Sequence, residues 1–160
     1  MEQVRVAYTQ FDGLGRRPGY AHEFDAGADL AITRDLTLEP GQRAVVGTGI
    51  AVAIPAGYAG FVYPRSGLAA RCGLSMVNSP GVIDAGYRGE VKLCLINTDT
   101  SVPINLKAGD LVAQMVVQPV VRAEFTEQAF LPESARGTGG YGSSGGVAAW
   151  RGSNVEATSN

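Results

Sequence analysis

The stretch Gln42–Tyr63, QRAVVGTGIAVAIPAGYAGFVY, decides the fold class. Three short runs rich in valine, alanine and aromatic residues make it up: residues 42–46, 49–54 and 58–63. Gly47, Pro55 and Gly57 separate these runs, and both residue types mark turns. Short β-prone runs with turn residues at spacings of about 8–12 positions predict a sandwich or barrel. We therefore expect an all-β protein.

The rest of the chain extends this pattern in both directions. Val4–Tyr8 alternates apolar and polar residues, and Val91–Ile96 is nearly all apolar, which predicts a strand covered on both faces. Leu111–Val121 is the longest apolar run, and we expect Pro119 to break it or to place its end on a sheet edge. Ser66–Gly73 differs, because a candidate N-cap serine, good helix formers and a terminal glycine predict one short helix.

The composition excludes several classes of protein. With 160 residues, 45% of them hydrophobic, the chain is long enough for one domain with a buried core. A net charge of −2 provides no broad basic surface for nucleic acid. No run reaches the roughly 18 apolar residues of a membrane helix, and residues 1–3 lack the start of a secretory signal. We expect a cytoplasmic protein that binds neither nucleic acid nor membranes.

Cysteine and histidine limit the metal and redox chemistry that is open to the chain. Cys72 and Cys94 make neither a disulfide framework nor a metal cluster, so we expect reduced, buried thiols. His22 is the only histidine, which excludes metal sites built on several histidines and catalytic triads that contain histidine. His22 itself is expected in a surface loop.

Near the C-terminus the composition changes. Residues 136–146 hold six glycines in eleven positions, which is typical of a flexible linker, yet no domain-sized sequence follows. A ligand-binding arm is the alternative. Residues 137–142 match a G-x-G-x-x-G pattern, but no strand is expected before it and no helix after it. We divide the chain into a β-barrel-like catalytic domain, an arm and a tail expected to be disordered, at residues 1–134, 135–146 and 147–160.

The densest polar cluster is Asn78–Glu90. Pro-Gly and Ala-Gly pairs flank a short apolar piece and predict a hairpin-like loop with Asp84 and Tyr87 near its tip. Two interpretations remain open. Asp84 is either an Asx-turn aspartate beside an ordinary tyrosine, or a carboxylate held on a rigid loop beside an aromatic platform.

Two further segments carry candidate chemistry. Arg65 and Ser66 stand at the start of the predicted helix, where they form either a phosphate site or a simple helix cap. Asp29 lies between apolar residues on an expected strand, so it makes either an ion pair or part of a metal shell. From these residues alone the chain is a β-rich enzyme that handles phosphate groups.

Taken together, five segments resemble the five motifs of the trimeric dUTP pyrophosphatase family, in order and at similar spacing. They are Ala26–Leu30, Pro64–Gly67, Asn78–Glu90, Gly109–Gln114 and Arg136–Gly145. The resemblance covers roughly residues 4–146 and is closest in feel to actinobacterial or phage members. Any one motif is a weak signal, whereas all five in order are a strong one.

The resemblance implies a jelly-roll-like (β-clip) fold and a homotrimer whose three active sites take residues from all three chains. It implies hydrolysis of dUTP to dUMP and pyrophosphate with Mg²⁺, which limits uracil incorporation into DNA and supplies dUMP for dTMP synthesis. It also implies roles by position. Asp84 would deprotonate the attacking water, and Asp29 would hold waters of the magnesium shell.

The remaining implied roles concern substrate binding. Asn78 would recognise the uracil edge, and Tyr87 would pack under the deoxyribose where a 2′-hydroxyl would otherwise fit. Backbone of the loop would assist at Gly81, Val82 and Ile83, and Lys92 would complete the substrate contacts. The phosphates would be bound by Arg65, Ser66, Gly67 and Gln114. The arm would close over them through Arg136, Gly142, Ser143 and Ser144, with Tyr141 stacking on the uracil.

This chain departs from the family pattern at two positions. Leu111 stands where the family usually has arginine after Gly-Asp, so Asp110 is expected to find another partner such as Arg71 or Arg88. Tyr141 replaces a commoner phenylalanine, and a phenol ring stacks equally well. The alternatives are a dCTP deaminase or bifunctional enzyme of the same fold, and a regulatory binding protein like those of phages.

Overall fold

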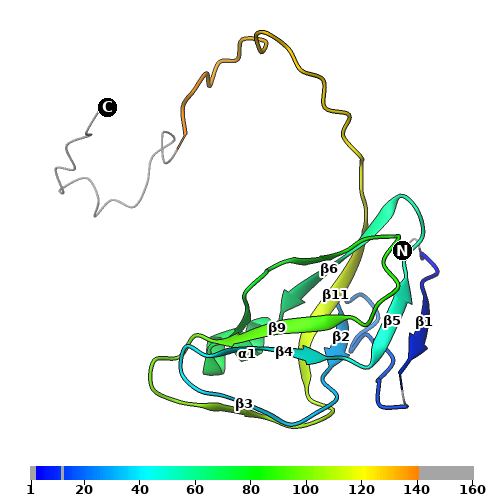
Figure 1. The fold of residues 1–160 in the computed structure, drawn as a ribbon, viewed down its shortest axis with the longest axis vertical. Coiled ribbons are helices and arrows are strands. Elements are labelled where there is room, and N and C mark those ends of the chain that lie inside the picture. The colour runs from blue at the N-terminus through cyan, green and yellow to red at the C-terminus, as the bar shows by residue number, and fades with distance from the viewer. Residues whose placement is uncertain (1–2, 12, 141–160) are drawn as a thin grey trace, which may run out of the picture. The chain divides into compact units, whose positions relative to one another are not determined.

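The computed structural model describes residues 3–11 and 13–140. The chain divides into two units, Met1–Arg122 and Ala123–Asn160. The first unit holds all the strands and the helix of the described residues (Figure 1). That helix, α1, has seven residues and is too short to cross a membrane.

Eleven strands and one α-helix make up the first unit, as far as the structure describes it. In chain order they are β1 (Ala7–Gln10), β2 (Ala28–Ala31), β3 (Leu36–Leu38), β4 (Arg43–Gly47), β5 (Ile50–Ala53), β6 (Tyr58–Pro64), α1 (Ser66–Cys72), β7 (Leu74–Met76), β8 (Gly81–Ile83), β9 (Lys92–Asn97), β10 (Ile104–Leu106) and β11 (Leu111–Pro119). The all-β prediction with a single short helix is confirmed.

The strands form four antiparallel sheets. The largest has the order β2-β11-β6-β8, a second has the order β4-β9-β7, and β1-β5 and β10-β3 form pairs. In the largest sheet Gln114 of β11 lies opposite both Asp29 of β2 and Tyr63 of β6. This register places three of the sequence motifs at one end of the sheet, because Arg65 follows directly after β6.

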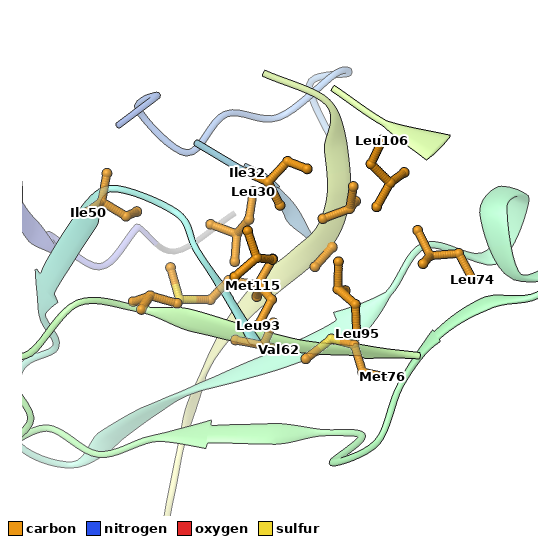
Figure 2. Packing of buried hydrophobic residues seen from close by; sticks show 14 of the residues in the cluster. Leu30, Ile32, Ile50, Val62, Leu74, Met76, Leu93, Leu95, Leu106 and Met115 are labelled. Atoms are coloured by element: carbon orange, nitrogen blue, oxygen red, sulfur yellow. The ribbon is translucent and has the colours of Figure 1, made fainter. Parts of the chain in front are cut away.

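The core lies between these sheets. Leu30 of β2, Val62 of β6 and Met115 of β11 face Leu93 and Leu95 of β9, and all are buried (Figure 2). Each fully buried side chain of this size contributes about 1.5–3 kcal/mol to the free energy of folding. The packed core thus gives the loops of this unit a rigid support.

Several sequence expectations need correction in detail. The first strand begins at Ala7 rather than Val4, and its four residues are exposed, since it is joined to β5 by backbone pairing at an edge. On β9 the side chains of Leu93 and Leu95 are buried, while Lys92 is exposed, so one face of this chain covers it rather than two. β11 ends at Pro119, as expected of a residue that has no N–H to donate.

The helix prediction holds except at its start. Arg65, in an extended conformation, is the N-cap residue, and Ser66 is the first helical residue and makes no capping bond. Gly73 closes the helix in the left-handed conformation, with φ of 71°, and its N–H donates to the Ala69 carbonyl. The expectation of a serine cap was wrong by one residue.

The second unit contains no helix or strand within residues 123–140. A turn forms at its end, where the Gly137 N–H donates to the Ser134 carbonyl at 3.0 Å and the Gly139 N–H donates to the Arg136 carbonyl at 3.1 Å. Gly137 has a φ of 51°, which glycine adopts without a steric cost.

Candidate active site

A first cavity, which we call the Arg65 cavity, opens at the start of α1 and has a volume of about 530 Å³. The Arg65 guanidinium lies 3.1 Å from Asp29 through Nε, and its Nη1 donates to the Leu111 carbonyl at 2.9 Å. The Asp29 side chain is only 14% exposed, whereas that of Arg65 is 35% exposed. The pair therefore joins β2, the start of α1 and β11, and the ion-pair interpretation of Asp29 is the one observed.

Small residues shape the rest of this cavity. A Cβ on Gly27 would lie 2.6 Å from Oε1 of Gln114, so glycine leaves room for the Gln114 amide. Ser66 is exposed at the first turn of α1, beside Gly67. The polar groups gathered here are thus one guanidinium, a hydroxyl and an amide, a set that suits phosphate oxygens.

A second cavity, which we call the Tyr87 cavity, has a volume of about 240 Å³. It is lined by Asn78, β8 and the residues up to Lys92. The loop is not a hairpin, because β8 pairs with β6 whereas β9 pairs with β4 and β7. It passes from one sheet to the other, and the Ser79–Pro80 peptide bond is cis.

Asp84 is exposed on this loop, and its carboxylate makes no hydrogen bond or ion pair with the described residues. The turn around it is closed by the backbone, since the Tyr87 N–H donates to the Asp84 carbonyl at 3.0 Å. The Asx-turn interpretation is therefore not what the structure has. A carboxylate free of partners and facing a cavity can accept a proton.

The other groups of the Tyr87 cavity are held by short contacts. The Tyr87 hydroxyl donates to the Glu90 carbonyl at 2.9 Å. A Cβ on Gly81 would lie 3.3 Å from Nδ2 of Asn78, so the amide lies against the start of β8. Lys92 Nζ is 3.8 Å from Glu90 Oε2. The cavity thus combines an amide, exposed backbone, a phenol ring and a free carboxylate.

The structure therefore sorts the predicted site residues into two groups with no lining residue in common. The Arg65 cavity contains Asp29, Arg65, Ser66, Gly67 and Gln114. The Tyr87 cavity contains Asn78, Gly81, Val82, Ile83, Asp84, Tyr87 and Lys92. Arg136 belongs to the second unit, where its Nε donates to the Gly139 carbonyl at 2.8 Å. Tyr141, Gly142, Ser143, Ser144 and the tail at 147–160 lie outside the described residues.

Two lining residues were missed. Glu90 lines the Tyr87 cavity, and its place at the end of the Asn78–Glu90 cluster was the available signal. Arg71 lines the Arg65 cavity, and its spacing of one helical turn from Gly67 could have indicated this. His22 was placed correctly, since its side chain is 84% exposed beside Asp25.

The expected partner of Asp110 was wrong. Its Oδ2 accepts from the backbone N–H of Lys107 at 2.8 Å and closes a turn, while Arg88 donates to the carbonyls of Ala85 and Tyr87. A backbone donor within three residues is available to Asp110 without ordering a long side chain. Leu111 and Arg71 line a separate cavity of about 770 Å³. Both cysteines are free thiols but half-buried rather than buried.

Comparison with known proteins decides the family. The family model described as dUTPase matches residues 16–145. This chain belongs to the dUTPase family. It is 57% identical over 146 residues to a deoxyuridine 5′-triphosphate nucleotidohydrolase of Thermobifida fusca, covering 91% of this chain and 82% of the relative. It is 58% identical to the protein of the same name from Rhodococcus erythropolis, covering 92% and 90%.

Solved dUTPase structures have the same jelly-roll fold. The dUTPase of Staphylococcus bacteriophage 80alpha with dUpNHpp matches with a TM-score of 0.81 at 27% identity, over 89% of this chain and 99% of that one. The dUTPase of phage phi11 of S. aureus, whose structure is described as revealing the coordination of a structural Mg(II) ion, matches with a TM-score of 0.75 at 25% identity, over 81% and 100%. Actinobacterial and phage members are thus both among the relatives of this dUTPase.

Proposed function

We infer that this chain hydrolyses dUTP to dUMP and pyrophosphate. Its membership of the dUTPase family supports this, and one observation in the structure supports it most directly. The partner-free carboxylate of Asp84 shares a cavity with Asn78 and Tyr87, which are suited to a nucleoside, whereas the guanidinium of Arg65 lies in a separate cavity. By consuming dUTP the reaction limits uracil incorporation into DNA and supplies dUMP for dTMP synthesis.

The Tyr87 cavity is proposed to bind the nucleoside. Asn78 and the β8 backbone at Gly81–Ile83 offer the donors and acceptors that a uracil edge requires. The phenol ring of Tyr87 packs under the deoxyribose, and a ring in contact with C2′ leaves no room for a hydroxyl. Asp84 takes a proton from the water that attacks the α-phosphorus.

The phosphates are proposed to bind in the Arg65 cavity. Arg65, Ser66 and Gln114 supply a cation, a hydroxyl and an amide, and Gly67 presents backbone. Stabilising the charge that develops on the phosphate oxygens is the larger part of catalysis in such reactions. Because Asp29 already pairs with Arg65, part of this cation's charge is balanced before the substrate arrives.

Magnesium is proposed as the cofactor. No three His, Cys, Asp or Glu side chains cluster anywhere in residues 3–11 and 13–140, so the chain offers no cage of its own there. One oxygen of Asp29 is paired with Arg65. This donor set fits a Mg²⁺ held mainly by phosphate oxygens and water, with Asp29 contacting that water. The ion would orient the triphosphate and offset its charge.

The complete site is proposed to form in a homotrimer. The Arg65 and Tyr87 cavities share no residue in this chain, which supports a site assembled from the Tyr87 cavity of one subunit and the Arg65 cavity of another. The arm, with Arg136, Tyr141, Gly142 and Ser143, would cover the bound nucleotide and exclude water. Its many glycines allow backbone N–H groups to approach phosphate oxygens closely.

A nucleotide panel tests the proposed function. Pyrophosphate release is measured with dUTP, UTP, dCTP, dTTP and dATP, with and without Mg²⁺. We expect rapid release from dUTP with Mg²⁺ and at least about 100-fold slower release from the others, because a site built to bond one base rejects those that leave its groups unpaired. Ammonia release from dCTP would support a deaminase instead, and no release from dUTP would refute the proposal.

A further inference from the structure

The ring of Tyr87 lies directly on the backbone of Gly89. A Cβ built on Gly89 would lie 2.7 Å from Cζ of Tyr87 and 3.0 Å from its Cε2, and it would also overlap the hydroxyl oxygen. Gly89 does not adopt a positive φ, so its backbone conformation does not require glycine. Glycine is needed here for space alone, and the space is filled by the Tyr87 ring.

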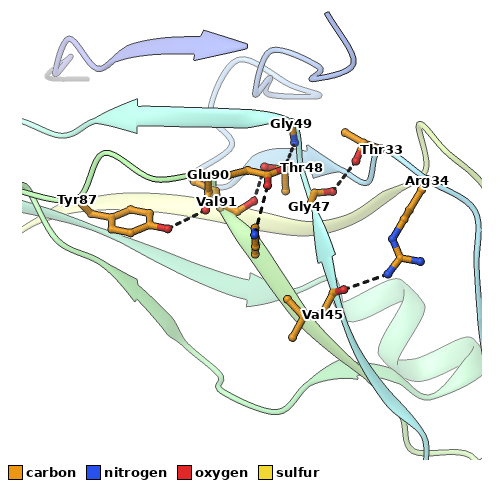
Figure 3. Close-up of polar contacts among 10 residues, drawn as sticks. Thr33, Arg34, Val45, Gly47, Thr48, Gly49, Tyr87, Glu90 and Val91 are labelled. Carbon is orange, nitrogen blue, oxygen red and sulfur yellow. Dashed lines mark hydrogen bonds and ion pairs between the residues drawn. The ribbon is translucent and has the colours of Figure 1, made fainter. Parts of the chain in front are cut away.

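The hydroxyl of the same ring is held at the next residue. Tyr87 Oη donates to the Glu90 carbonyl at 2.9 Å (Figure 3). The Glu90 side chain in turn accepts a hydrogen bond from the Gly49 N–H at 2.9 Å through Oε1. It lies against Gly47, where a Cβ would be 2.9 Å from Cδ of Glu90. Glu90 thereby fixes its own carbonyl relative to the turn between β4 and β5.

These contacts matter because Tyr87 is not held by burial. The residue is 43% exposed, and an exposed aromatic side chain is otherwise free to change its χ1 rotamer. Gly89 supports the face of the ring and the Glu90 carbonyl fixes its tip. Loss of either contact leaves the ring free to move away from the position where the sugar would contact it.

We propose that Gly89 and Glu90 are positioning residues that set the choice between deoxyribose and ribose, by holding the Tyr87 ring in one orientation. The proposal rests on the proposed function and on the sugar contact of Tyr87 within it. Gly89 and Glu90 do not touch the substrate in this proposal. They act through Tyr87 only, and the effect of changing them must therefore disappear when Tyr87 is absent.

Gly89→Ala is the direct test, and Gly86→Ala is its matched control. Gly86 lies on the same loop, has no atom within 4 Å of a Cβ built on it and also lacks a positive φ. The new methyl at position 89 displaces the far end of a flexible side chain, so the fold should persist. We expect the ratio of kcat/KM for dUTP to that for UTP to fall at least about tenfold in Gly89→Ala and to stay at the wild-type value in Gly86→Ala.

A double variant separates positioning from general damage. In the Tyr87→Ala background, Gly89→Ala should leave the dUTP-to-UTP ratio unchanged, because the ring on which it acts is gone. A second pair covers the case in which Gly89→Ala does not fold. Glu90→Gln keeps an acceptor for the Gly49 N–H and should preserve the ratio, whereas Glu90→Ala should lower it.

The outcomes divide cleanly. A folded Gly89→Ala protein with the wild-type ratio overturns the inference, as does a further fall in the double variant or equal ratios in Glu90→Ala and Glu90→Gln. Such results leave the proposed function intact if the wild-type protein hydrolyses dUTP in preference to UTP. A wild-type protein that releases no pyrophosphate from dUTP overturns both.

Discussion

The Arg65 cavity and the Tyr87 cavity are built in opposite ways. Asp29, Arg65 and Leu111 come from distant parts of the sequence and are brought together by the pairing of β2 and β6 with β11. The Tyr87 cavity is shaped mainly by contacts within one loop, where Tyr87 rests on Gly89 and Glu90. The first therefore depends on the fold of the sheet, and the second on the sequence of a short segment.

Their charges differ in the same sense. The Arg65 guanidinium is paired with Asp29 at 3.1 Å, so removing either group leaves the other without its partner in a half-buried place. The Asp84 carboxylate has no partner among the described residues, so removing its charge costs the fold nothing. Substitutions in the Arg65 cavity should therefore change stability and activity together, whereas those in the Tyr87 cavity should change activity alone.

The largest effect is expected for Asp84→Asn. Loss of a positioned general base lowers turnover by about 10²–10⁴-fold. The melting temperature and the affinity for a non-hydrolysable dUTP analogue should stay close to wild type, since Asp84 makes no contact within the described fold. Steady-state rates and calorimetric titration measure these quantities. Turnover within tenfold of wild type would show that another group is the base.

Truncation after Ser134 is expected to have the next largest effect. It removes Arg136 and the glycine-rich residues while leaving every strand of the first unit in place. Turnover should fall by about 10²–10³-fold through the loss of a cation and backbone donors at the leaving pyrophosphate. The oligomeric state and the melting temperature should not change. Full activity in the truncated protein would make residues 135–146 a simple tail.

Arg65→Ala tests the distant contacts of its cavity. We expect KM for dUTP to rise by about ten- to a hundredfold, and the free energy of unfolding to fall by about 1–3 kcal/mol because Asp29 and the Leu111 carbonyl lose their donor. Arg65→Lys keeps the charge but cannot make both contacts, so it should recover only part of each loss. If stability is unchanged in both variants, the ion pair does not support the fold.

Asn78→Ala is the matching change in the Tyr87 cavity and should have the smallest effect. It leaves groups of the uracil unpaired, at a cost of about 1–3 kcal/mol in binding. The affinity for inorganic triphosphate and the melting temperature should be unaffected, because Asn78 is exposed and lies outside the Arg65 cavity. Competition assays with dUTP and triphosphate compare the two. An equal loss for both ligands would contradict a role in base recognition.

The two regions also differ in how far the sequence could predict them. Gly81, Asp84 and Tyr87 lie within one short segment, so their grouping could be inferred from the chain alone. The pairing of Asp29 with Arg65 could not, because it depends on strand register. The all-β class followed from turn spacing, whereas the exposed position of β1 did not, since alternation cannot distinguish an edge pair from a buried strand.

The departure at Leu111 shows the same limit. The sequence identified the missing arginine, but not that the Leu111 carbonyl would accept from Arg65 or that Asp110 would bond to the backbone of Lys107. Backbone groups are the same in every residue, so contacts made by them leave no mark in the sequence. The role of Gly89 was hidden for a similar reason, because a glycine chosen for space resembles one chosen for a turn.

The most direct test of the account is whether the two cavities that form one site belong to different subunits. Asp84→Asn and Arg65→Ala chains, each nearly inactive alone, are unfolded together, refolded and purified as mixed trimers. If a site takes Asp84 from one subunit and Arg65 from its neighbour, random mixing restores about a quarter of the wild-type dUTP turnover. If mixed trimers form but stay as inactive as their parents, both cavities serve one site within a single chain, and the account is wrong.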